Sequence, residues 1–144
     1  RAEIMKDLIC PSIMKKQHVI GDRSIVSTFA YQKARGANQA SLDFLYSIYL
    51  SENWPIPNLI VLLDIDLETF ENRLKANRKF FAPRDIFEAA QQEVIENTIA
   101  NYRALCKNRF LSDNWLLIDG RKSEEEIHGL IYEKVLSMPE YNRN

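Results

Sequence analysis

Residues 59–65 have the sequence LIVLLDI, an apolar run that contains one charged residue, Asp64, near its end. A strand that is apolar on both faces is typical of the interior of a parallel sheet, because helices then cover both sides. Two further stretches, HVIGD at 18–22 and WLLIDG at 115–120, have the same form. The sequence therefore predicts three buried strands of one parallel sheet.

Apolar residues at helical spacing fill the stretches around these strands. The first predicted helix is expected to bend at Pro11, and the second is expected to break around residues 36–38. Ser123 and Glu126 have the spacing of a capping box at the start of the last helix. Because strands alternate with helices, the predicted fold class is α/β. Helices are expected over residues 1–16, 27–50, 67–79, 86–105 and 123–136.

The composition excludes several classes of function. The chain has 144 residues, 46% of them hydrophobic and 27% charged, which fits one ordinary globular domain. A net charge of -1 gives no general attraction to nucleic acid or to an anionic membrane. No apolar run approaches the roughly 20 residues of a spanning helix. Cys10 and Cys106 are too few for a disulfide framework, so buried thiols in the cytoplasm are expected.

Acidic residues stand at or near the end of each predicted strand. These are Asp22, Asp64 with Asp66, and Asp119. In open α/β sheets, ligands bind at the edge formed by the carboxyl ends of the strands. The pattern indicates a site at that edge, although each aspartate alone could simply terminate its strand.

The segment DRSIVSTFAYQ, residues 22–32, carries the densest set of functional side chains. Arg23 has the planar fork that binds a phosphate bidentately, and the start of the following helix offers free N–H donors to the same anion. Asp22 suits the hydration shell of a metal ion or a sugar hydroxyl. Tyr31 and Gln32 offer a stacking face and an amide for a base. The segment predicts a nucleoside monophosphate pocket; the alternative is an Asp–Arg pair that only caps a helix.

The same segment resembles the DR-x-x-x-S-T-x-A-Y-Q motif of thymidylate kinases. The resemblance continues in order and spacing over nearly the whole chain. Residues 57–68 resemble the family's P-D-L strand with its D-x-D-P-E ending. Residues 85–88 resemble the D-x-F-E that closes the family's lid, and residues 117–126 resemble its last strand, turn and helix.

The resemblance implies a P-loop NTPase-type parallel sheet flanked by helices, as one partial domain over residues 1–144 with a lid at about 73–88. It implies transfer of the γ-phosphoryl group of ATP to dTMP, giving dTDP, with Mg²⁺. It also implies a homodimer that packs through the long helices, with no nucleic acid and no membrane as partner.

The resemblance assigns one group of residues to dTMP. Arg23 would hold the phosphate, while Asp22 would lie near the transferred phosphate and, through water, near the metal ion. Tyr31 would crowd the sugar 2′ position, and Arg1 would hydrogen-bond the thymine. The full set assigned to dTMP is Arg1, Arg23, Ser27, Thr28, Tyr31, Gln32 and Phe87.

A second group is assigned to ATP. Arg73, Arg78 and Arg84 lie on or beside the lid, where the family's cations meet the phosphates and the adenine. Cations there stabilise the charge that spreads over the transferred group, so Arg78 and Arg84 join Asp22 and Arg23 as catalytic residues. The turn at Arg121 and Lys122 would border the adenine. As alternatives, Arg73 could belong to a solvated helix face, and Tyr31 and Phe87 could be core aromatics.

The sequence contains no G-x-x-x-x-G-K-[ST] segment, the loop that cradles the phosphates of the donor. In thymidylate kinases this loop follows the first strand, which precedes the part of the family that this chain resembles. We therefore expect the chain to be the carboxyl-terminal two-thirds of a longer kinase.

Two other functions stay open at this stage. Ser24 replaces the aromatic residue usual after Asp-Arg, and nucleoside kinases of a related fold have an E-R-S segment. A deoxynucleoside kinase is thus one alternative. The other is a non-catalytic nucleotide-binding remnant that has lost the phosphate loop.

Overall fold

The computed structural model of the chain describes residues 2–76, 89–139 and 141. Within these residues the sheet has two strands, β1 (Ile60–Asp64) and β2 (Trp115–Asp119), which pair in parallel. The register places Ile60 beside Trp115 and Asp64 beside Asp119. The prediction of a parallel α/β arrangement is confirmed, and both strands end in a carboxylate at the same edge.

Helices precede, connect and follow the two strands. Two of them lie between β1 and β2 in the chain, which gives the long crossover that parallel strands require. In chain order the helices are α1 (Ala2–Ile4), the π-helical turn η1 (Met5–Ile9), α2 (Cys10–Met14), α3 (Ile25–Ala34), α4 (Gln39–Ser51), α5 (Leu67–Ala76), α6 (Ala89–Lys107) and α7 (Glu124–Leu136).

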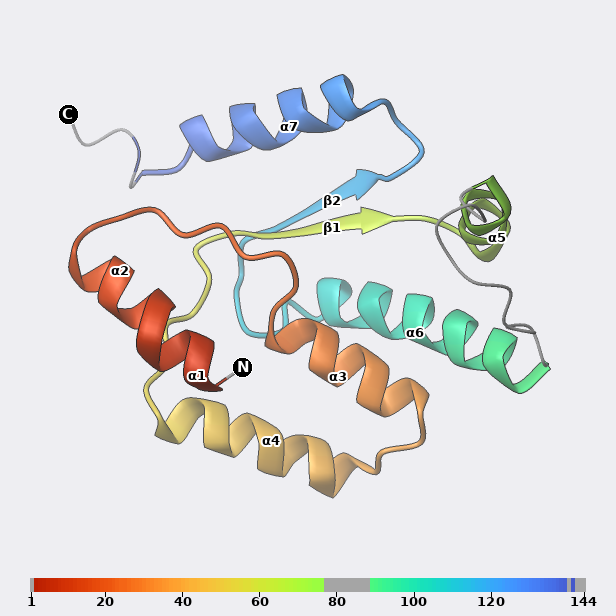
Figure 1. The fold of residues 1–144 in the computed structure, drawn as a ribbon, viewed down its shortest axis with the longest axis horizontal. Coiled ribbons are helices and arrows are strands. Elements are labelled where there is room, and N and C mark those ends of the chain that lie inside the picture. Colours follow the sequence, from red (N-terminus) through yellow and green to blue (C-terminus); the bar gives the residue numbers. More distant parts are fainter. Residues whose placement is uncertain (1, 77–88, 140, 142–144) are drawn as a thin grey trace.

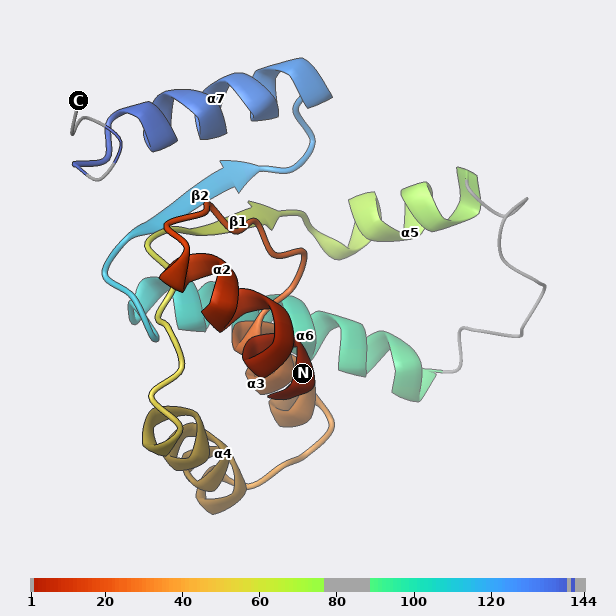
Figure 2. The ribbon, with the colours of Figure 1, turned by 60° about the vertical axis from the view of Figure 1, so that its left-hand side comes forward.

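The helices form layers on both sides of the strand pair (Figure 1, Figure 2). α7 lies on one side, while α6 and α3 lie side by side on the other, with α4 beyond α3. α5 continues from the carboxyl end of β1, away from the body of the sheet. No helix in the described part of the chain is long and apolar enough to cross a bilayer.

Local signals in the sequence explain where the helices begin and end. The hydroxyl of Ser123 accepts a hydrogen bond from the backbone N–H of Glu126, whose carboxylate accepts one from the N–H of Ser123, so the predicted capping box is confirmed. The predicted break after α3 is also confirmed. There Gly36 has a φ of 86°, and the side chain of Asn38 caps α4 by accepting from the N–H of Ser41.

The first helix changes from π to α geometry just before Pro11, where a bend was predicted. Proline has no N–H and therefore cannot donate to the carbonyl one turn earlier. The helix accommodates this with the wider turn η1 immediately before α2, in which Pro11 occupies the first turn.

The core joins α3 to the amino-terminal half of the strand pair. Val26, Ile60 and Trp115 are 3%, 9% and 8% exposed and contact one another. The indole N–H of Trp115 donates to the backbone carbonyl of Phe110 at 3.2 Å, so its one polar atom is paired. This core sets the position of the sheet against α3 and α6.

One predicted strand is wrong. Residues 17–21 have no regular secondary structure, and Ile20 is 99% exposed. An apolar run becomes a strand only where a neighbour accepts its backbone hydrogen bonds, and within the described residues β1 pairs with β2 alone. Asp22 consequently follows an extended segment and is not at the end of a strand.

The two thiols are less enclosed than predicted. Cys10 and Cys106 are free and half-buried. Burial raises the pKa of the Cys106 thiol, which keeps it protonated at neutral pH.

Gly120, directly after β2, fills a place that has no room for a side chain. Its N–H donates to the carbonyl of Asp64 at 2.8 Å, and an added Cβ would lie 2.9 Å from Cγ2 of Ile65. We expect Gly120→Ala to lower the free energy of unfolding by about 1–3 kcal/mol, measured by denaturant titration. Gly129→Ala is the matched control: its Cβ would meet nothing within 4 Å, and alanine favours helix α7 by about 0.5–1 kcal/mol. Equal stability of the two variants would contradict the prediction.

Candidate functional site

Arg23 stands just before α3 in a conformation that few residues other than glycine adopt. Its φ is 68°, in the left-handed region, and the hydroxyl of Ser24 then caps α3 by accepting from the N–H of Val26. The guanidinium of Arg23 donates to the hydroxyl of Tyr31 at 3.0 Å and lies 5.6 Å from the centre of that ring. The guanidinium is a permanent cation, as in any arginine, and the hydrogen bond to Tyr31 raises its pKa further.

Tyr31 itself contacts α6. Its ring meets the ring of Tyr102 edge-to-face, with 6.2 Å between the ring centres. Tyr102 in turn packs against the core of Val26, Ile60 and Trp115. We call Arg23, Tyr31 and Tyr102 the Arg23 cluster; it joins an exposed cation to the interior through two aromatic rings.

The other predicted dTMP residues of this segment lie along α3 or just before it, with Gln32 near the end of the helix. Asp22 and Gln32 are exposed, and Thr28 is half-buried. Ser27 is 5% exposed and faces the interior. Its assigned role in dTMP binding stays a prediction, as do those of the other residues in the segment.

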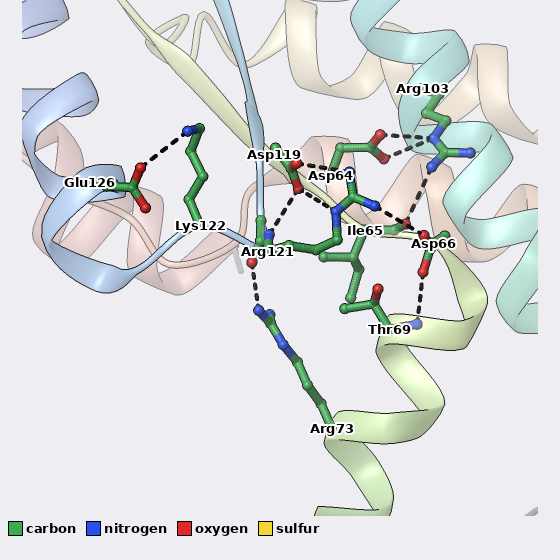
Figure 3. Close-up of polar contacts among 11 residues, drawn as sticks. Asp64, Ile65, Asp66, Thr69, Arg73, Arg103, Asp119, Arg121, Lys122 and Glu126 are labelled. Atoms are coloured by element: carbon green, nitrogen blue, oxygen red, sulfur yellow. Dashed lines mark hydrogen bonds and ion pairs between the residues drawn. The ribbon is translucent and has the colours of Figure 1, made fainter.

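A second group of charges lies where the two strands end (Figure 3). Arg121 makes a double hydrogen bond with Asp119, with Nε and Nη2 at 2.9 Å and 2.8 Å from the carboxylate oxygens, and lies 3.7 Å from Asp66. These contacts lower the pKa of Asp119 to about 2, chiefly through the side-chain hydrogen bonds from Arg121. Hydrogen bonds from Thr69 likewise lower the pKa of Asp66. Both carboxylates are therefore ionised at neutral pH.

Arg103 of α6 completes this group. Its Nε donates to both oxygens of Asp64, at 2.8 Å and 3.1 Å, and its Nη2 donates to the carbonyl of Ile65 at 3.4 Å. These residues surround a hollow of about 310 Å³, lined by Asp64, Ile65, Asp66, Arg103, Leu117, Asp119 and Arg121. Since both guanidinium groups are already paired with carboxylates, the described lining of the hollow offers no free cation to a phosphate.

The remaining predicted ATP residues in the described part are also engaged. Arg73 of α5 donates to the carbonyl of Gly120 at 2.6 Å, which ties α5 to the turn after β2 (Figure 3). Arg73 is nevertheless exposed, so its role toward ATP and the alternative of a solvated helix face both stay open. Lys122 meets Glu126 one turn along, at 3.3 Å and well exposed, a kind of pair that contributes little to stability. The structure thus places Arg73 at the turn that carries Arg121, a contact that the sequence did not predict; the roles of both residues toward ATP stay predictions.

Four predicted site residues lie outside the described residues. They are Arg1, Arg78, Arg84 and Phe87; of the lid predicted at about 73–88, only residues 73–76 are described. Their assigned roles stay predictions.

Two residues of α6 that the sequence reasoning did not single out occupy key places. Tyr102 contacts Tyr31, and Arg103 binds Asp64. Neither belongs to a motif, because their partners are 71 and 39 residues earlier in the chain, respectively. The sequence shows only that both residues lie on the helix predicted over 86–105, and nothing in it points to their partners.

Comparison with known proteins identifies the family that the chain is similar to. The family model described as thymidylate kinase matches residues 1–131. The thymidylate kinase of Blochmanniella floridana is 33% identical over 133 residues, which cover 92% of this chain and 59% of that protein. The thymidylate kinase of Onion yellows phytoplasma is also 33% identical, over 94% of this chain and 63% of that protein.

A third relative, the thymidylate kinase of Cupriavidus pinatubonensis, is 32% identical over 95% of this chain and 64% of its own length. The chain therefore spans about three fifths of the length of the curated relatives it matches. No solved structure matches it.

Proposed function

Since this chain belongs to the thymidylate kinase family, we propose that the protein transfers the γ-phosphoryl group of ATP to dTMP and releases dTDP and ADP. The observation that carries the proposal is the family match over residues 1–131, which includes the whole Asp22–Gln32 segment. Because the chain spans only part of its relatives, the proposal concerns the full-length gene product. A phosphate loop for the donor would have to come from outside these 144 residues.

The geometry of the Arg23 cluster supports the acceptor half of the reaction. Arg23 is exposed, permanently charged and held next to the amino end of α3, where backbone N–H groups also favour an anion. A monophosphate placed there would gain a bidentate contact with the guanidinium. Thymidine has no phosphate and would gain nothing from it, so the cluster favours dTMP over the nucleoside.

A magnesium ion is part of the proposal through the chemistry of its ligands. Mg²⁺ keeps several waters and binds one or two carboxylates together with substrate phosphates. Among the described residues no group of three potential ligands forms a cage, whereas the exposed carboxylate of Asp22 beside Arg23 fits a contact through water. When bound, the ion would neutralise charge on the phosphates.

Family membership also supports a homodimer and a cytoplasmic location, and both belong to the proposal. Exposed apolar side chains are present on η1 and α4. Examples are Leu8 at 61% exposure and Phe44 at 65%. Such side chains suit an interface between helices of two copies.

An acceptor assay tests the proposal. Full-length gene product, ATP and Mg²⁺ are incubated with dTMP or with thymidine, and the nucleotides are separated by chromatography. We expect dTDP from dTMP and no dTMP from thymidine. Phosphorylation of thymidine instead would establish a deoxynucleoside kinase, and nucleotide binding without turnover of either acceptor would establish a non-catalytic remnant.

A further inference from the structure

Three consecutive residues of α6 contact three different parts of the molecule. The side-chain amide of Asn101 donates to the carbonyl of Ala30 on α3 at 3.1 Å. Tyr102 meets Tyr31 edge-to-face, and Arg103 binds Asp64 and the carbonyl of Ile65. α6 is thereby fixed against α3 on one side and against the end of β1 on another.

This fixation matters because Arg23 is a long side chain at the surface. An exposed arginine samples many rotamers, and ordering it on a ligand costs free energy that weakens binding. Arg23 is held by Tyr31, through the hydrogen bond of 3.0 Å and the contact with its ring. Whether Arg23 is ordered therefore depends on how firmly the ring of Tyr31 is held.

Tyr102 contacts this ring from α6. The edge-to-face contact fixes the plane of the Tyr31 ring, and the core contacts of Tyr102 fix the second ring in turn. Asn101 binds the carbonyl of Ala30, which is fully buried and precedes Tyr31 in the chain. Asn101 directly precedes Tyr102, and Ala30 directly precedes Tyr31. The hydrogen bond between Asn101 and Ala30 thus sets the spacing between the two aromatic residues.

We propose that Tyr102 is a positioning residue for phosphate recognition: it orders Arg23 through Tyr31 and so pre-organises the guanidinium for the phosphate of dTMP. The proposal rests on the proposed function for the identity of the ligand. The ordering itself is a property of the protein without ligand.

The test compares Tyr102→Leu with Tyr102→Phe in the full-length gene product. Leucine removes the ring edge, whereas phenylalanine keeps it and loses only the hydroxyl. We expect Tyr102→Leu to raise the Kd for dTMP roughly two- to tenfold, the range that an aromatic pair contributes, and to raise the Kd for thymidine clearly less, since thymidine meets Tyr31 at the sugar but has no phosphate for Arg23. Tyr102→Phe should bind both as the wild type does. Titration calorimetry supplies all these constants.

Phe110→Leu is the matched control for loss of core packing. Phe110 contacts Phe29 of α3 and Tyr46 of α4, at 4.7 Å and 5.3 Å between ring centres, and is absent from the Arg23 cluster. The Phe110→Leu variant should lower the melting temperature as Tyr102→Leu does, and it should leave the ratio of the Kd for dTMP to the Kd for thymidine unchanged. An equal weakening of dTMP and thymidine by Tyr102→Leu, or no weakening of dTMP, would overturn the proposal.

A second measurement separates this proposal from the proposed function. Nuclear relaxation of the Arg23 Nε–H group in the ligand-free protein should show greater mobility in Tyr102→Leu than in wild type or Tyr102→Phe. If that difference is present and the wild type binds no dTMP, the proposed function fails and the positioning role stands. If the wild type phosphorylates dTMP and Arg23 is equally ordered in all three proteins, the positioning role fails alone.

Discussion

Arg23→Ala is expected to lower kcat/KM for dTMP by about 10³-fold, the usual cost of removing a cation that stabilises a transferring phosphoryl group. The side chain is exposed at the start of α3, and Tyr31 directs its guanidinium. A coupled assay of ADP release at saturating ATP measures the effect. Because an acceptor phosphate is bound in the ground state as well, KM for dTMP should rise along with the fall in kcat.

Arg23→Lys distinguishes charge from geometry. Lysine keeps the positive charge but lacks the planar fork, so it binds a phosphate oxygen as a point charge. We expect this variant to recover only part of the lost activity. Full recovery would mean that Arg23 contributes long-range charge alone and would contradict the bidentate contact.

Arg23→Gly serves as the stability control. The left-handed backbone at this position costs a residue other than glycine about 1–2 kcal/mol, so glycine should raise the stability while activity falls as in Arg23→Ala. A thermal melt beside the kinetic assay would then show the two properties moving in opposite directions. Loss of activity together with loss of stability in both variants would point to a structural role for Arg23.

The fold could be predicted from the sequence where the pattern is local. The capping box of Ser123 and Glu126 and the cap at Asn38 each depend on side chains within three residues. The strands at 60–64 and 115–119 could be predicted because they are apolar on both faces and end in acid. Segment 18–22 has the same pattern but no partner strand among the described residues, and pairing is not a property of the segment itself.

In the candidate site, too, the residues that could be predicted belong to local sequence patterns, and those that could not depend on contacts between distant segments. The Asp22–Gln32 segment could be recognised because its functional residues follow one another in one short stretch of sequence. Arg103 could not, since its role comes from Asp64, which approaches it only when α6 packs against β1. Arg121 and Asp119 are only two residues apart, yet their ion pair could not be predicted, because the sequence does not show which acid an arginine in a turn will bind.

Trp115→Ala is expected to give the largest loss of stability in the described part of the chain. The indole is 8% exposed, contacts Val26 and Ile60, and donates to the carbonyl of Phe110. Truncation leaves a cavity and an unpaired carbonyl, at a cost of about 3–5 kcal/mol in the free energy of unfolding. Since single domains have only about 5–15 kcal/mol in total, this variant should unfold at much lower denaturant concentration.

Trp54→Ala is the matched control, because Trp54 is half-buried against Tyr49 and lies outside the core of Val26, Ile60 and Trp115. With less apolar area lost and a site open to solvent, it should cost about half as much or less. Far-ultraviolet circular dichroism is the suitable probe, since each variant lacks one of the two tryptophans. Equal losses would mean that the packing of α4 on its following loop stabilises the protein as much as the contact between α3 and the sheet, and the hierarchy inferred from burial would be wrong.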